Sequence, residues 1–223
     1  MLPLLMAVSA MAGYFVERGI TVPAPILIPS PSASVMPSAS PYAPETWKTW
    51  QDGMYDKKTG SYTGYAFSYP RDFDVNRRDY ASGNLMGTAL VQLRFPEDAF
   101  VTPKTNFAQA YMTVAMATGT RALSACFLVP GLQGMKPMDT ILDIHGQQFR
   151  AATSTDVGAG SLYASHVYRT EYKNACYEFS LTVHTGNIMN YTPGTVTEFD
   201  SAQAFEILTK IVQSVRFTDV PRL

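Results

Sequence analysis

Hydrophobic and polar positions alternate along much of the chain between residues 64 and 186. In GYAFSYP, for example, Tyr65, Phe67 and Tyr69 fall on one side of an extended chain. A period of two is typical of a strand with one buried face. The pattern predicts strands at residues 64–70, 73–75, 85–95, 110–116, 146–156, 161–172 and 175–186. Short turn signals separate several of them, so neighbouring strands are expected to pair antiparallel.

A helical period replaces this alternation in two places. Residues 200–217 predict a helix with Asp200 or Ser201 as its N-cap. One face of this helix is an apolar stripe that comprises Ala204, Phe205, Leu208, Ile211, Val212 and Val215. Residues 118–129 predict a shorter helix. The end at Arg216 and Phe217 is expected to return as a short edge strand. The expected fold is α+β: a mostly antiparallel sheet of about six to seven strands, packed with helices in a layered sandwich.

A different kind of segment opens the chain. Residues 2–16 are almost wholly apolar, and Ala10-Met11-Ala12 resembles a small-residue cleavage site. The run is short for a membrane-spanning helix, which needs roughly 20 residues, and suits the core of a signal peptide. We therefore expect a signal or membrane-anchor segment at residues 1–20. A buried core helix is the alternative.

A proline- and serine-rich segment follows. Seven of the chain's 15 prolines and five serines lie between residues 23 and 44. Proline removes backbone donors and serine adds little burial, so neither helix nor sheet is expected. We expect a stalk at residues 21–44 and a globular domain at residues 45–223. This order indicates an extracytoplasmic domain, tethered to the membrane or secreted. A disordered tail on a cytoplasmic protein is the alternative, but it leaves the apolar run unexplained.

Composition and charge narrow the possible functions. The chain has 223 residues, of which 46% are hydrophobic and 16% charged, as expected of one folded domain with appendages. The formal net charge is −1, which gives no basic excess for binding nucleic acid. The sequence contains no serine-hydrolase, zinc-protease or phosphate-loop motif. We therefore expect no catalytic residues and no cofactor.

Three segments resemble a known family. They are WKTW (47–50), GYAFSYPRDFDV (64–75) and FEILTKIVQSVRF (205–217). They are similar to the opening and closing segments of PsbP/Mog1-like domains, and closest to those of uncharacterised membrane-anchored bacterial PsbP-related proteins. Trp50 stands where tyrosine is usual, and Phe73 where tryptophan is commoner. The segment between Trp50 and Gly64 is also longer than usual. The resemblance implies an α+β fold and a binding or accessory role, and it supplies no catalytic motif.

Cys176 and His184 pose a question of chemistry because they lie eight residues apart. On one strand this spacing puts them about 26 Å apart. A nucleophile and its base must approach to about 3 Å, so these two residues are not direct partners. Cys126 is the other cysteine, and an even count in an exported chain suggests a disulfide between Cys126 and Cys176. Two buried free thiols and a reactive Cys176 are the alternatives.

The histidines of the last strands are not expected to share a metal. With a turn at residues 173–174, His184 is expected to pair near residue 163, and His166 near residue 181. The two side chains are then about three residues out of register.

Asp139, Asp143 and His145 form a second cluster. On a strand the two aspartates lie about 13 Å apart. On a helix they adjoin and could hold a hard metal ion weakly. Solvated surface carboxylates are the favoured interpretation, so no metal site is expected.

Tyrosines gather in the last strands, where Tyr177 lies, and in the TGNIMNYTPGT loop that follows them. A tyrosine-rich rim suits a contact surface because each ring offers apolar area with a polar tip. The possible binding surface comprises Tyr163, Tyr168, Tyr172 and Tyr191. Ordinary packing within the sheet is the alternative.

The leading hypothesis is a membrane-tethered, extracytoplasmic, non-catalytic binding or accessory domain. Its partner would be a protein or another component of the cell envelope, and its N-terminal segment would meet the membrane. One alternative is a secreted hydrolase that uses His145 or His166 with nearby acids. Another is a structural protein of the cell surface.

Overall fold

A computed structural model describes five stretches of the chain. The chain divides into two units, residues 1–38 and 39–223. The described residues are 46–56, 61–76, 87–100, 104–129 and 136–221. The expected signal segment and stalk lie outside them. Within the described residues, no helix combines the length and apolar character needed to cross a membrane.

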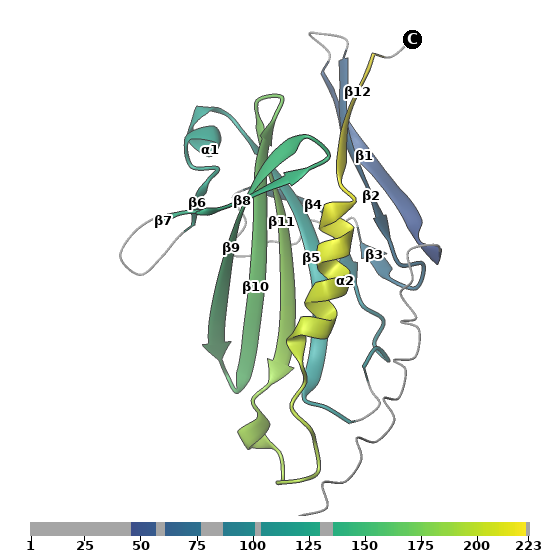
Figure 1. Ribbon diagram of the computed structural model, residues 1–223, viewed down its shortest axis with the longest axis vertical. Coiled ribbons are helices and arrows are strands. Elements are labelled where there is room, and N and C mark those ends of the chain that lie inside the picture. Colours follow the sequence, from purple (N-terminus) through teal and green to yellow (C-terminus); the bar gives the residue numbers. More distant parts are fainter. Residues whose placement is uncertain (1–45, 57–60, 77–86, 101–103, 130–135, 222–223) are drawn as a thin grey trace, which may run out of the picture. The chain divides into compact units, whose positions relative to one another are not determined.

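A seven-stranded antiparallel sheet, ordered β3-β4-β5-β11-β10-β9-β8, forms the centre of the second unit (Figure 1). Its three long central strands are β5, β10 and β11. The strand bounds are β3 Asp74–Asn76, β4 Thr88–Arg94, β5 Phe107–Thr118, β8 Thr140–Ile144, β9 Gln147–Gly158, β10 Ser161–Tyr172 and β11 Ala175–Gly186.

Two-residue turns set the register of the long strands. The β9–β10 turn has positive φ at Ala159 (48°) and Gly160 (78°), and the β10–β11 turn has positive φ at Lys173 (48°) and Asn174 (60°). Turns of this kind match the twist of paired strands, and Gly and Asn adopt positive φ most readily. The expected pairings are confirmed: His184 lies opposite Tyr163, and His166 lies opposite Leu181.

One face of this sheet is covered by the helix α2, Ser201–Gln213 (Figure 1). The carboxylate of Asp200 accepts a hydrogen bond from the backbone N–H of Ala202 at 3.0 Å, so Asp200 is the N-cap. The whole predicted apolar stripe is buried, together with Ile207. The predicted C-terminal helix is therefore confirmed.

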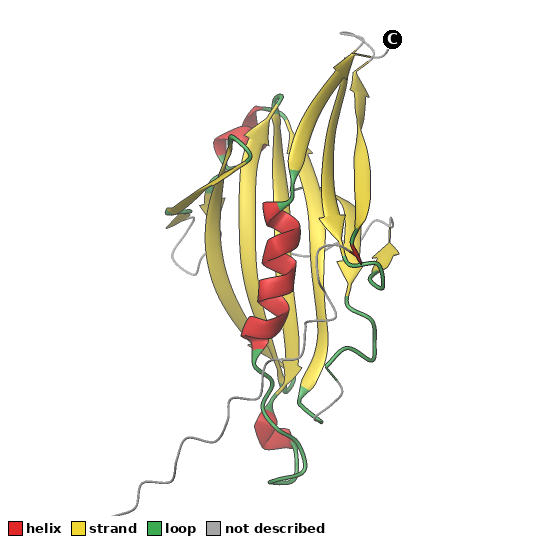
Figure 2. Ribbon diagram, turned by 45° about the vertical axis from the view of Figure 1, so that its right-hand side comes forward, coloured by secondary structure: helices red, strands yellow, loops and turns green. Residues whose placement is uncertain are grey.

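A second, three-stranded sheet has the order β1-β2-β12, with bounds Lys48–Asp56, Ser61–Tyr69 and Arg216–Pro221. It packs on the same face as α2, because the ring of Tyr65 lies 5.8 Å from that of Tyr177 and 6.3 Å from that of Phe179 (Figure 2). The unusually long segment between Trp50 and Gly64 extends the β1–β2 hairpin.

The opposite face of the large sheet carries the segment that follows β5. It contains α1 (Thr120–Ser124), β6 (Leu128–Val129) and β7 (Lys136–Pro137). Cys126 is joined to Cys176 of β11 by a disulfide, and both residues are buried. The predicted cysteine pair is thus bridged in the structure.

Arg169 and Glu178 form a buried ion pair beside this disulfide. The guanidinium Nε donates to Glu178 Oε2 at 2.6 Å, and both side chains are at most 5% exposed. Nη1 of Arg169 also donates to the carbonyls of Cys126 and Leu128, at 3.3 and 2.6 Å. Burial raises the pKa of Glu178, and the charge and hydrogen bond of Arg169 oppose that rise. The arginine therefore fastens the segment to the sheet.

The α+β fold class is confirmed, but one detail of the prediction is wrong. The helix predicted over residues 118–129 ends at Ser124. The carbonyls of Cys126 and Leu128 accept from Arg169, and Cys126 is held by its disulfide, so the chain leaves the helical path. The large sheet has seven strands, as expected, and the described residues contain twelve strands in all. Strands β6, β7 and β8 are short and carry no clear alternation.

Replacing Glu178 by Gln is expected to lower the free energy of unfolding by about 3–5 kcal/mol, because it removes the carboxylate that neutralises the buried charge of Arg169 at 2.6 Å. Urea unfolding of the oxidised chain measures this. Lys210→Gln is the matched control: it removes an exposed pair with Glu206 (2.7 Å) and is expected to cost less than about 0.5 kcal/mol. Equal effects of the two substitutions would contradict the role given to Arg169.

The paired substitution Cys126→Ala with Cys176→Ala is expected to lower the free energy of unfolding by up to about 4 kcal/mol, because the bridge joins residues 50 apart in sequence. Chemical unfolding of oxidised wild type and the double variant provides the comparison. If the two chains unfold at the same denaturant concentration, the bridge contributes nothing to stability.

Candidate functional site

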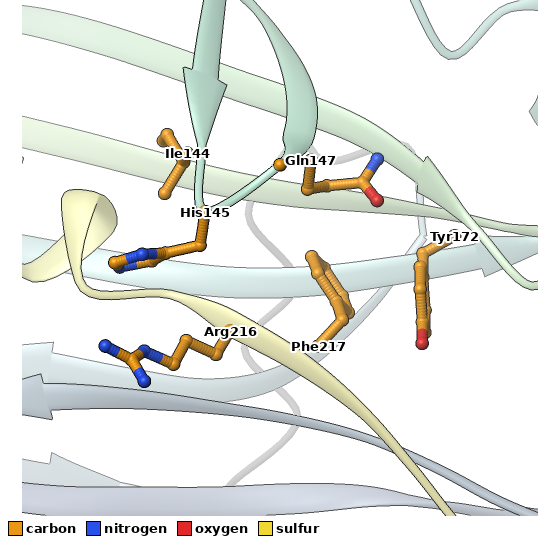
Figure 3. Close-up of a pocket in the computed structure, with 7 residues that line it drawn as sticks. Ile144, His145, Gln147, Tyr172, Arg216 and Phe217 are labelled. Carbon is orange, nitrogen blue, oxygen red and sulfur yellow. The ribbon is translucent and has the colours of Figure 1, made fainter.

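A cleft opens where the two sheets meet, between the β8–β9 turn and the start of β12. We call it the inter-sheet cleft. Its volume is about 410 Å³, and it is lined by Ile144, His145, Gly146, Gln147, Tyr172, Arg216 and Phe217. The imidazole of His145 and the guanidinium of Arg216 lie at one side, and the rings of Phe217 and Tyr172 at the other (Figure 3). The cleft is therefore cationic at one side and aromatic at the other.

The β8–β9 turn places His145 at the cleft. His145 and Gly146 have φ values of 53° and 81°, as a two-residue hairpin turn requires. The carboxylate of Asp143 accepts a hydrogen bond from the backbone N–H of Gly146 at 2.9 Å, which holds the turn. Non-glycine residues are uncommon at positive φ, and histidine is among those that tolerate it best. The turn can therefore hold His145 at the cleft without a large strain.

The end of α2 places Arg216. The hydroxyl of Ser214 accepts from the backbone N–H of Ser68 on β2 at 2.8 Å and donates to the carbonyl of Ile211 at 2.7 Å. These contacts turn the chain from the helix into β12, where Arg216 pairs with Ala66. Arg216 is exposed, and its side chain forms no ion pair or hydrogen bond within the described part of the chain. The guanidinium is thus available to a ligand.

An aromatic wall, formed by Phe217 and Tyr172, closes the other side. The two rings stack with centroids 4.5 Å apart. Phe217 also meets the edge of Tyr177 at 5.0 Å and lies 6.4 Å from Phe149. Above the wall, the amide nitrogen of Gln147 donates to the Thr170 hydroxyl at 2.6 Å. The wall is fixed by the core, so a ligand would meet a preformed surface.

A second cavity of about 300 Å³ adjoins the cleft. It shares His145 and Arg216 with the cleft, and its other lining residues are Thr49, Ala66, Phe67, Ser68 and Ser214. Among the described residues that line either cavity, none is an aspartate or a glutamate. The charge carried by Arg216 is therefore not neutralised within the cleft, and the site favours anions.

The tyrosines predicted as one binding surface lie in different environments. Tyr168 is buried in the core, Tyr172 belongs to the aromatic wall, and Tyr163 stacks on His184 with centroids 4.3 Å apart. Tyr191 is 38% exposed, beyond the end of β11. Tyr163 and Tyr172 point to opposite faces of β10, because nine positions separate them on one strand. The structure therefore does not bring the four rings together, and that prediction is wrong as a single surface.

His166 and His184 also lie on opposite faces of the large sheet. His166 stacks on Phe205 of α2 with centroids 3.8 Å apart. Burial lowers the pKa of both histidines. Within the described part of the chain, neither His145 nor His166 hydrogen-bonds a carboxylate. No observation therefore favours the hydrolase hypothesis.

The acidic cluster is not gathered around an ion. Residues 140–144 form the strand β8, so the alternative with Asp139 and Asp143 adjacent on a helix is wrong. Asp143 instead caps the turn before Gly146. Across the residues that the structure describes, no group of three or more His, Cys, Asp or Glu side chains could hold a metal ion.

Sequence reasoning considered His145 and Tyr172 but missed Arg216, Phe217 and Gln147 as parts of a site. Arg216 and Phe217 follow a helix whose apolar stripe ends at Val215, and they look like ordinary strand residues. The sequence offered only the His145-Gly146 pair as a turn signal, and such a pair cannot indicate a partner about 70 residues away. The site is formed by tertiary packing.

Comparison with known proteins finds similar solved structures but no family. No protein-family model matches the chain, and no curated protein matches it. The similar solved structures include the following three. LpqN of Mycobacterium tuberculosis, involved in cell envelope biogenesis, has a TM-score of 0.41 at 10% identity, over 78% of this chain and 92% of its own. The cyanobacterial PsbP of Synechocystis has a TM-score of 0.32 at 14% identity, over 76% and 92%.

A protein of Bacteroides thetaiotaomicron has a TM-score of 0.37 at 12% identity, over 68% of this chain and 44% of its own, so this chain spans less than half of that protein. The similar structures thus include a PsbP protein, from the family whose segments the sequence resembles. At these identities and TM-scores the similarity concerns the fold alone and carries no argument about a ligand or an activity.

Acid is expected to destabilise the chain through the partly buried histidines His166 and His184. Burial lowers the pKa of His166 and His184 in the folded state, so the unfolded state binds more protons below the usual histidine pKa of about 6.5. Their contribution is fully present above that pH and is lost as the pH falls from there towards the folded pKa. Urea unfolding at several pH values between about 5 and 8 measures the slope.

His166→Phe keeps a ring on Phe205 but cannot titrate, so it is expected to reduce this slope, and adding His184→Phe to reduce it further. An unchanged slope in the double variant would show that these histidines do not cause the acid sensitivity.

Proposed function

We propose that this chain is a membrane-tethered, extracytoplasmic binding or accessory domain that acts without catalysis. Its N-terminal apolar run and stalk would hold the folded domain away from the membrane surface. Its partner would be a protein or another component of the cell envelope.

The disulfide between Cys126 and Cys176 is the observation that best supports a domain outside the cytoplasm. Disulfides persist in oxidising compartments and are rare in the cytosol. This bridge lies inside the domain and joins α1's trailing segment to a central strand. It is therefore part of the architecture, which favours export of the chain.

The inter-sheet cleft supports a binding role. It is preformed by the core, is open to solvent, and combines an available cation with an aromatic surface. Binding sites commonly join an apolar surface to a few convergent polar groups.

Export is tested by the redox state of the cysteines in cells. When the full chain is produced with its own N-terminus, both cysteines are expected to resist alkylation under denaturing conditions until a reductant is added, because they are bridged. Intact mass counts the alkyl groups. A chain lacking residues 1–20 is the control and is expected to alkylate at both cysteines without reductant, because it stays in the cytosol. Alkylation of the full chain without reductant would contradict the proposal.

A further inference from the structure

We propose that the inter-sheet cleft binds an oxyanion, a carboxylate or a phosphate, carried by a molecule whose flat apolar part lies on the aromatic wall. The inference rests on the proposed binding function and assigns it a site and a chemical class of ligand. His145 and Arg216 would hold the anionic group, and Phe217 with Tyr172 would hold the flat part.

The charge balance around Arg216 indicates an anion. Its guanidinium is a cation and offers a planar fork of donors that matches a carboxylate or a phosphate. The guanidinium of Arg169, by contrast, is neutralised by Glu178, whose Oε2 lies 2.6 Å from its Nε. Arg216 has no such partner within the described stretches, and the carboxylate nearest to the turn, Asp143, is engaged by the backbone of Gly146 at 2.9 Å.

His145 adds a second donor from a different element. It lies on the β8–β9 turn, whereas Arg216 starts β12, and both line the two adjoining cavities. Both side chains project to the same side of the cleft (Figure 3). An oxyanion there could accept from both groups and join the two sheets through the ligand.

The aromatic wall favours a ligand whose anionic group is attached to a flat apolar group. Phe217 and Tyr172 are fixed in a stack whose centroids lie 4.5 Å apart, next to the cationic side. Aromatic rings gain from offset or edge contacts with another ring as well as from apolar burial. A neutral aromatic molecule can use only the wall, and a bare inorganic anion only the cationic side. A molecule with both parts should bind best.

Two other cavities give weaker support for a ligand site than the inter-sheet cleft does. A groove beside α2 holds His166, but its lining also includes Asp200 and the ion pair of Glu206 with Lys210, so it offers no available cation. A cavity near the β9–β10 turn is lined mainly by glycine, small polar and aliphatic residues, with Glu198 as its one described charged residue. Neither combines an available cation with an aromatic wall.

The test is an NMR titration of the oxidised full chain in neutral detergent at low ionic strength, since salt screens an exposed cation. Four probes separate the parts: phenyl phosphate, benzoate, inorganic phosphate and neutral benzyl alcohol. Phenyl phosphate or benzoate is expected to bind saturably and to shift the resonances of Arg216, His145 and Phe217. Benzyl alcohol and inorganic phosphate are each expected to bind at least about tenfold more weakly. The ratio of phenyl phosphate to benzoate affinity distinguishes a phosphate from a carboxylate ligand.

Two variants test the residues. Arg216→Gln removes the charge and is expected to weaken binding of the anionic aromatic probe about tenfold or more. His145→Asn keeps a residue that tolerates positive φ and is expected to weaken binding by a smaller factor. Arg121→Gln, which removes an exposed arginine of α1 on the opposite face of the large sheet, is the matched control and should bind as wild type does.

Three results would overturn the inference: benzyl alcohol binding as tightly as benzoate, shifts that map away from the cleft, or equal binding by the Arg216→Gln and Arg121→Gln variants. Because the titration uses oxidised, folded protein, these results leave the placement outside the cytoplasm untouched. Conversely, failure of the alkylation experiment in cells would reject the placement without affecting this site.

Discussion

Burial of the apolar face of α2 is the constraint on which the rest of the domain depends. Leu208, Ile211 and Val212 are fully buried between the helix and the sheets, and each contributes about 1.5–3 kcal/mol relative to exposure. Once this face is seated on β11 and β5, the helix must end beside β2, where the hydroxyl of Ser214 bonds the backbone of Ser68. The chain can then only continue as β12, at the edge of the small sheet. The inter-sheet cleft is a consequence of that path.

The local parts of this arrangement could be predicted from the sequence. The bounds of β10 and β11 follow from strict alternation around the Lys173-Asn174 turn, and the start of α2 follows from Asp200. The early end of α1 could not be predicted, because the contacts that follow the helix are made with Arg169 and Cys176 from distant strands. The cleft could not be predicted for the same reason. Its donors come from a turn and from the start of a strand that no pattern relates to each other.

The two faces of the large sheet differ in how their arginines are placed. On one face, Arg169 is buried and paired with Glu178, and its remaining donors hold two backbone carbonyls. A buried ion pair of this kind is costly to break and therefore fixes the geometry of the disulfide-linked segment. On the other face, where the sheets meet, Arg216 is exposed beside His145 and an aromatic wall. The first arginine has a structural role, and the second is available for recognition.

The central claim is that the domain meets its partner through the inter-sheet cleft. The most direct measurement is photocrosslinking in living cells, with a photoreactive residue placed at Thr49 on the rim of the adjoining cavity or, as a control, at exposed Thr120 of α1 on the opposite face. The account predicts a discrete adduct from position 49, found by mass spectrometry of the purified chain, and none from position 120. The same adducts from both positions, or an adduct from position 120 alone, would contradict it.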